Sequence, residues 1–246
     1  HLRNPPHLSV DMSCVQCTLF MNRQHFQIQL DELMGDTLAL GQAVTEAVAQ
    51  ALEAVLHYDI ERMTAVIAND QHINTAVEAL HRRCLTVIAC QQPMAGDLRA
   101  ISVVLSLLPE FERMADHAAT CCKIGQRMLA SPYFLPLAEL DGEFTRIIPE
   151  MGARVVQLLQ HGLDALQRRD AAYAEQICRE DDAIDHLYKR LFTETITTVQ
   201  RQPECSDEAI HLLTLAHNLE RIGDRVTNLA EQVIFLLRGE VVELNT

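Results

Sequence analysis

Apolar residues recur at helical spacing through nearly the whole chain, and this rhythm constrains the fold more than any other feature. Repetition at i, i+3, i+4 and i+7 is typical of amphipathic helices. Helices of about 30 residues would each be about 45 Å long, which suits elongated bundles. The sequence therefore predicts an all-α fold. The expected helices cover roughly residues 24–57, 63–91, 97–129, 139–167, 171–201 and 206–238.

The composition agrees with long helices joined by few loops. The 246 residues include only 9 Gly, 8 Pro and no Trp, and aromatic residues make up 4%, so turn formers and strand-favouring aromatics are scarce. No apolar stretch reaches the 18 or so residues that a transmembrane helix needs, and none is expected. A net charge of −14 argues against nucleic acid as a partner, because binding to phosphates depends on basic residues.

The two halves of the chain resemble each other. The segment 112–116 (ERMAD) aligns with 220–224 (ERIGD), and the apolar positions before it align as well. On the preceding helix of each half, 70–74 (DQHIN) aligns with 181–185 (DDAID). Two different helices thus repeat in the same order, which indicates a duplicated three-helix unit.

We expect three segments from this repeat. Residues 22–130 should form the first three-helix bundle, and 138–240 the second. Residues 1–21 show no helical rhythm and are expected to be an irregular extension. The 8 Cys do not resemble the framework of a small secreted domain, so we expect free thiols in a reducing compartment, packed as small apolar side chains where they fall in helices.

Acidic residues form rows along several of these helices. Glu220 and Asp224 lie one turn apart on the last helix, and Asn228 follows one turn later. Two carboxylates at i, i+4 repel each other by a few tenths of a kcal/mol, and a bound cation would remove that penalty. Oxygen ligands suit magnesium, calcium, manganese or iron. The candidate ligands are Asp70, Glu112, Asp116, Asp181, Asp185, Glu220, Asp224 and Asn228.

A row of charges is also what any solvated helix face shows. The recurrence of Glu-Arg-x-x-x-Asp in both halves, with acids on the preceding helix each time, favours a site over simple solvation. Arg113 and Arg221 are the arginines of these motifs. An equally good interpretation of each is that it is an exposed ion-pair partner of a nearby acid.

Three segments carry a resemblance to a known family: residues 91–99 (QQPMAGDLR), 111–116 (FERMAD) and 218–231 (NLERIGDRVTNLAE). These are similar to the PhoU family, and the similarity extends from about residue 24 to 238. It implies two tandem three-helix bundles, each with an acidic motif able to hold a metal cluster of iron, manganese, magnesium or zinc.

The resemblance further implies a non-enzymatic, cytoplasmic regulator. PhoU-like proteins restrain phosphate uptake and keep the phosphate-starvation two-component system off when phosphate is plentiful. The implied partners are the ATPase of the phosphate ABC transporter and the sensor histidine kinase, which would bring the protein to the inner membrane. A homodimer is also implied.

The chain departs from the family pattern mainly in its first half. Asn74 stands where the family usually has Asp, and residues 120–122 (TCC) replace Asn-Ile-Ala. In the second half, Arg225 replaces the usual His. Because the first half lacks one anionic ligand, we expect the better cation site in the second repeat.

Two other functions remain open from the sequence. A metal-free helical adaptor for another phosphate permease would use its acidic rows only as a docking surface. A di-metal carboxylate oxidase would need Glu-x-x-His pairs, and the chain has two, Glu78 with His81 and Glu208 with His211. Neither GxxxxGK[ST] nor GxGxxG is present, which argues against a nucleotide-binding enzyme.

Overall fold

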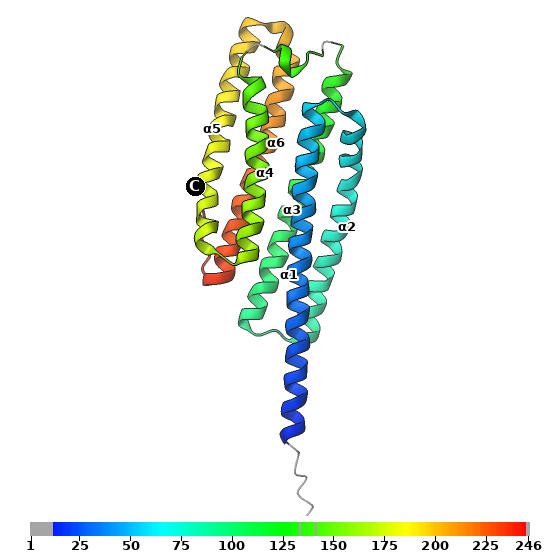
Figure 1. Ribbon diagram of the computed structural model, residues 1–246, viewed down its shortest axis with the longest axis vertical. Helices are drawn as coiled ribbons and strands as arrows, with labels where there is room; N and C mark the ends of the chain where they lie inside the picture. Colours follow the sequence, from blue (N-terminus) through cyan, green and yellow to red (C-terminus); the bar gives the residue numbers. More distant parts are fainter. Residues whose placement is uncertain (1–11, 133, 141, 245–246) are drawn as a thin grey trace, which may run out of the picture.

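The chain folds into two antiparallel three-helix bundles packed side by side along their length (Figure 1). This computed structural model describes residues 12–132, 134–140 and 142–244, with side chains from residue 23 onward. The part of the chain so described contains no strand, and the expected all-α fold with two bundles is confirmed. The helices are α1 Met12–Leu56, α2 Ile60–Gln91, α3 Ala95–Ala130, α4 Phe144–Arg168, α5 Ala171–Arg201 and α6 Ser206–Arg238; two short 3-10 helices are η1 Leu137–Glu139 and η2 Pro203–Cys205.

The start of α1 differs from the sequence expectation. The missing apolar rhythm predicts an irregular segment up to residue 21, yet the helix begins at Met12. Neither Pro nor Gly occurs between Pro6 and Gly35, so nothing in this stretch interrupts a helix that the apolar rhythm stabilises further on. Residues 1–11 lie outside the described part of the chain. No described helix is apolar enough over a sufficient length to cross a membrane.

The same turn joins the first two helices of each bundle. Tyr58 and Arg169 both adopt left-handed backbone conformations, with φ of 58° and 53°. The next residue, Asp59 or Asp170, donates its N–H to a carbonyl in the last turn of the preceding helix and caps the following helix with its carboxylate. The repeat in the sequence is therefore a repeat in backbone geometry, even though neither left-handed residue is glycine.

The two bundles meet through equivalent contacts. Leu163 of α4 lies where a Cβ atom of Gly41 in α1 would be, and Leu52 of α1 lies 2.9 Å from where a Cβ atom of Gly152 in α4 would be. In the alignment that pairs 70–74 with 181–185, the two glycines correspond to each other, and so do the two leucines. The bundles are therefore related by an approximate two-fold axis between α1 and α4. One continuous apolar core runs through both bundles.

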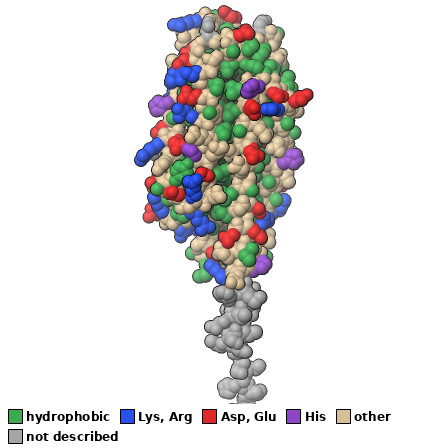
Figure 2. Space-filling view, viewed as in Figure 1, with side chains coloured by type: hydrophobic (Ala, Val, Ile, Leu, Met, Phe, Trp, Pro, Cys, Tyr) green, Lys and Arg blue, Asp and Glu red, His purple; other side chains and the backbone are tan. Residues whose placement is uncertain are grey.

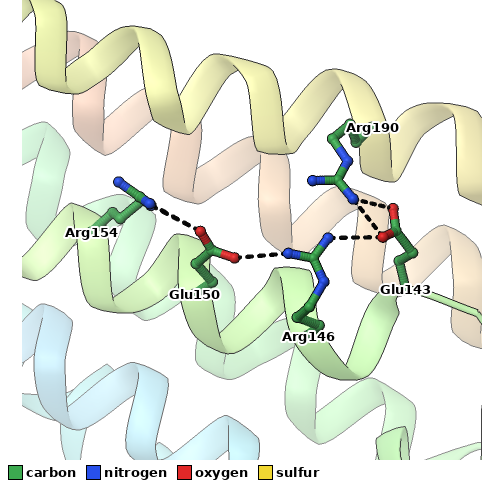
Figure 3. A network of polar contacts seen from close by, with 5 residues as sticks. All are labelled: Glu143, Arg146, Glu150, Arg154 and Arg190. Carbon is green, nitrogen blue, oxygen red and sulfur yellow. Dashed lines mark hydrogen bonds and ion pairs between the residues drawn. The ribbon is translucent and has the colours of Figure 1, made fainter.

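Surface ion pairs tie α4 to α5 at one end of the second bundle (Figure 3). The Glu143 carboxylate accepts hydrogen bonds from Arg146 and from Arg190 of α5, and the first of these contacts contributes most to lowering its pKa. Arg146 and Arg154 also reach Glu150, at 3.1 and 3.0 Å. All five side chains are exposed or half-exposed, so we assign this network a role in solvation and helix registry rather than in a site.

Candidate functional site

The acidic rows of α5 and α6 come together, as the sequence predicted. Asp181 of α5 is only 6% exposed, although it is a carboxylate. Burial, and then the negative charges of Asp185, Asp224 and Glu220, raise its pKa to about 7. We call these four residues the α5–α6 acidic cluster. Their closeness means that the cluster carries a repulsion that a proton or a cation would relieve.

Gly223 leaves room on α6 for the Asp181 carboxylate. Asp181 Oδ1 occupies the position where a Cβ atom of residue 223 would lie. Any other residue there would displace the Asp181 carboxylate, because a Cβ atom cannot share its space. Gly223 is therefore part of the site, although the sequence analysis did not select it.

Arg221 offsets part of this charge, and His217 lies beside it on α6. Arg221 lies 2.9 Å from Asp224 Oδ2 and 3.3 Å from Glu220 Oε2, and His217 Nδ1 is also 3.3 Å from that Glu220 oxygen. The buried Glu220 Oε2 nevertheless has no partner with hydrogen-bond geometry among the described residues. Burial is the largest cause of a raised pKa at Glu220. These contacts agree with the interpretation of Arg221 as a partner of nearby acids. Its counterpart Arg113 is exposed.

Asn228 and Arg225 point away from the cluster, toward the other bundle. The Asn228 side-chain amide donates to Glu110 Oε2 of α3 at 3.0 Å, and Arg225 Nη1 lies 3.4 Å from the same oxygen. The expectation that Asn228 would join Asp181 and Asp224 as a ligand does not match this placement, because its position on the helix faces α3. Glu110 had no signal in the sequence, since both partners lie far away along the chain, in the other repeat.

A second polar contact between the bundles is the counterpart of this one. His117 Nδ1 of α3 lies 2.9 Å from Asn218 Oδ1 of α6. In the alignment that pairs 112–116 with 220–224, His117 corresponds to Arg225 and Asn218 to Glu110. The approximate two-fold axis therefore also passes between α3 and α6, with the Glu110–Arg225 ion pair on one side and the His117–Asn218 contact on the other.

The equivalent acidic residues of the first bundle form a weaker cluster. Burial and the charge of Asp116 raise the pKa of Asp70, whereas nearby Lys123 and a hydrogen bond from Asn74 lower it. Glu112 is not among the groups that shift this pKa; it lines a surface groove between α2 and α3 with His81 and Glu78. Asp70 and Asp116 therefore come together, and Glu112 lines the groove between α2 and α3.

The two Glu-x-x-His pairs occupy different bundles. Glu78 and His81 are on α2, while Glu208 and His211 are on α6. Glu208 is 1% exposed, but the His211 ring is directed to the carbonyl of Asp207 in its own helix. A di-iron centre requires facing helices with inward Glu and His ligands, and these four residues do not form that arrangement.

The cysteines behave as expected with one exception. Cys84, Cys121 and Cys122 are buried in the core as free thiols, and burial raises the pKa of each. Cys90 is exposed, because it lies near the end of α2 on its outer face. Position within a helical pattern thus predicted packing for three of these four side chains.

The donor set of the α5–α6 acidic cluster fits a hard cation. Two observations support this: a carboxylate that is almost fully buried, and a buried Glu220 oxygen without a hydrogen-bond partner in the described chain. Among the residues that the structure describes, no three His, Cys, Asp or Glu side chains already stand in the geometry of a metal site. Cation binding would therefore require the side chains to converge, with Arg221 releasing Asp224.

These features define an internally duplicated helical-bundle protein with an acidic cluster between the last two helices of the second repeat. The family model described as "PhoU domain" matches residues 37–125 and 148–233, one copy in each bundle. The chain belongs to the PhoU family.

Known proteins resemble the chain over nearly its whole length. A "Phosphate-specific transport system accessory protein PhoU homolog" of Clostridium acetobutylicum is 30% identical over 226 residues, which is 92% of this chain and 100% of that protein. The homologue of Caulobacter vibrioides is 34% identical over 212 residues, covering 86% of this chain and 89% of its own. Both are named for the phosphate-specific transport system.

Solved structures show the same fold. The crystal structure of PhoU from Pseudomonas aeruginosa superposes with a TM-score of 0.78 at 28% identity, covering 87% of this chain and 100% of that one. The phosphate transport system regulatory protein PhoU from Streptococcus pneumoniae gives a TM-score of 0.79 at 30% identity, covering 89% and 99%.

Proposed function

We propose that this protein is an accessory regulator of phosphate-specific transport, which restrains phosphate uptake and keeps phosphate-starvation signalling off while phosphate is plentiful. The observation that carries the proposal is the match of both bundles to the PhoU domain, together with similarity over most of the chain to proteins named as accessory to this transport system. A non-enzymatic role goes with it, since those relatives are named as accessory and regulatory proteins.

The proposed partners are the ATPase of the phosphate ABC transporter and the phosphate-sensing histidine kinase. Contact with them would place the protein on the cytoplasmic side of the inner membrane. A net charge of −14 suits partners with basic docking surfaces. On the face shown in Figure 2, acidic and basic side chains are interspersed. We also propose a homodimer, to be tested by light scattering at several protein concentrations.

We propose further that the α5–α6 acidic cluster binds a hard cation such as magnesium, manganese or iron. The raised pKa of Asp181 supports this, because a cation would replace the proton that the buried carboxylate otherwise retains. Asp181, Asp185, Glu220 and Asp224 would hold the ion. Once bound, the ion would cancel their repulsion and fix α5 against α6.

The regulatory proposal is tested by alkaline phosphatase activity in phosphate-rich medium. A strain of the source organism that lacks this gene should show high activity, and the gene on a plasmid should restore the repressed level. A plasmid carrying Glu150→Gln, a surface acid outside the cluster, serves as a matched control for an acid-to-amide change in Asp185→Asn. Repression by Glu150→Gln but not by Asp185→Asn would connect the cluster to signalling.

One result would contradict the signalling role, and another would contradict its link to the acidic cluster. Unchanged alkaline phosphatase activity after deletion would reject the signalling role and favour an adaptor for another phosphate permease. Full repression by Asp185→Asn would leave the signalling role standing and separate it from the acidic cluster.

A further inference from the structure

Glu110 is an acidic residue of the first bundle that pairs with residues of the second. Its Oε2 atom lies 3.0 Å from Asn228 Nδ2 and 3.4 Å from Arg225 Nη1. The side chains of Glu110 and Arg225 are only 14% and 22% exposed, so water screens this ion pair poorly. The pair crosses the interface between α3 and α6, close to the approximate two-fold axis.

Arg225 adjoins the acidic cluster in the chain but faces Glu110 in the structure. It follows Asp224 in the chain, and successive side chains on a helix point about 100° apart. Asp224 therefore faces α5 and the acidic cluster, while Arg225 faces α3 and Glu110. The Arg225 Nε atom is buried without a hydrogen-bond partner among the described residues, so the contact to Glu110 is what holds its guanidinium on this side.

We infer that Glu110 is a positioning residue that sets the cation affinity of the α5–α6 acidic cluster by holding and neutralising Arg225. The first bundle would thereby control a property of the second. Without the Glu110 charge, the Arg225 guanidinium would be an unpaired cation beside the cluster. It would then repel a divalent ion and compete for Asp224. This inference rests on the proposed cation binding.

The counterpart of this contact on the other side of the axis provides the comparison. His117 and Asn218 occupy the positions equivalent to Arg225 and Glu110, and their contact at 2.9 Å also joins α3 to α6. A change there loosens the same interface without altering the charge of Arg225. His117→Gln is therefore the control for a purely structural effect.

The test is calorimetric titration of the full chain with Mn²⁺ at low ionic strength and pH 8. Glu110→Gln and Arg225→Gln break the same ion pair but change the local charge in opposite directions. We expect Glu110→Gln to weaken Mn²⁺ binding about tenfold and Arg225→Gln to strengthen it severalfold. The double variant should bind Mn²⁺ as tightly as Arg225→Gln alone, because without Arg225 the Glu110 carboxylate has no guanidinium to hold or neutralise. His117→Gln should leave binding unchanged.

Three other results would overturn the inference. If both single variants weaken binding alike, the pair is only structural and the inference is wrong, while cation binding by the cluster stands. Unchanged affinity in both variants would lead to the same conclusion. If the unaltered protein binds no Mn²⁺, the proposed cation site fails and this inference fails with it. Circular dichroism melting of each variant checks that all are folded.

Discussion

The two bundles share a scaffold but carry acidic clusters of different character. In the second bundle, Asp181 is 6% exposed and its pKa is raised to about 7 by burial and neighbouring acids. In the first, the equivalent Asp70 is less buried and has Lys123 near enough to lower its pKa. Duplication has thus preserved the helix geometry, while the electrostatics of the two sites have diverged.

Three substitutions account for the difference. Asn74 in the first bundle corresponds to Asp185 in the second, and Lys123 corresponds to Glu231, so both changes make the first cluster less negative. The third change is Ala115 for Gly223. A Cβ atom at residue 223 would clash with Asp181 Oδ1, so the first bundle, with Ala115 at the equivalent position, cannot hold its Asp70 carboxylate in the same place. The scaffold alone therefore does not define the site.

The largest expected effect tests whether the two bundles fold as one unit. Phe111 is fully buried beside Gly41, and its counterpart in the second bundle is Leu219. Phe111→Ala should cost about 3–5 kcal/mol and Leu219→Ala about 2–5 kcal/mol of the free energy of unfolding. Because the core is continuous, guanidinium unfolding of each variant should remain a single transition. Two separated transitions would show that the bundles are independent.

The second prediction concerns pH. An Asp whose pKa in the folded state is above its ordinary value binds more protons in the folded than in the unfolded state, so stability falls as pH rises. For Asp181 this loss should occur between about pH 4 and pH 7 and be complete above pH 7. Asp181→Asn should remove most of this slope and stabilise the protein at pH 8, by on the order of 2 kcal/mol.

Urea unfolding from pH 4 to pH 8 measures this effect. Asp70→Asn is the matched change in the first bundle and should flatten the curve much less, since Asp70 is closer to solvent and has a basic neighbour. Equal effects of the two variants would contradict the difference between the clusters.

Much of the fold follows from the sequence, for identifiable reasons. The apolar rhythm predicted the bounds of α5 and α6, and α2, α5 and α6 end just before Pro93, Pro203 and Gly239, residues that do not continue a helix. Asp181 and Asp224 were both selected as candidate ligands because they belong to acidic motifs that recur on two helices of each half. These are properties of single helices and their nearest neighbours, which the spacing of residues specifies.

The remaining features depend on how the bundles pack. Glu110 has no local pattern, because its partners are chosen by the register of α3 against α6. The orientation of Asn228 follows from that same register, which is why its side chain turns from the acidic row toward α3. Tyr58 and Arg169 adopt left-handed conformations that sequence rules assign to Gly, so their shared turn is visible only in the structure.

The third prediction compares cation binding by the two clusters. Asp224→Asn should weaken Mn²⁺ binding at least tenfold, because it removes one of the four carboxylates and leaves Arg221 to pair with the rest. Asp116→Asn is the same change in the first bundle and should alter binding less than twofold. Titration calorimetry with each variant provides the comparison, and unchanged affinity or stoichiometry in Asp224→Asn would reject the assignment of the site.

The smallest effect is expected from restoring an acid to the first cluster. Asn74 donates weakly to Asp70 Oδ2, at 3.5 Å, and Asn74→Asp would replace that contact with repulsion. The pKa of Asp70 should rise further, and stability at pH 8 should fall by less than about 1 kcal/mol because the site is only partly buried.

If missing charge alone separates the two clusters, Asn74→Asp should create a second Mn²⁺ site detectable by calorimetry. We expect instead only weak binding, because Lys123 remains close and Ala115 still occupies the space that Gly223 leaves free in the second bundle. Adding Lys123→Glu should strengthen that binding severalfold. If the single Asn74→Asp variant bound Mn²⁺ in the first bundle as tightly as the second bundle does, charge alone would distinguish the two halves. The space beside Gly223 would then contribute little to the affinity.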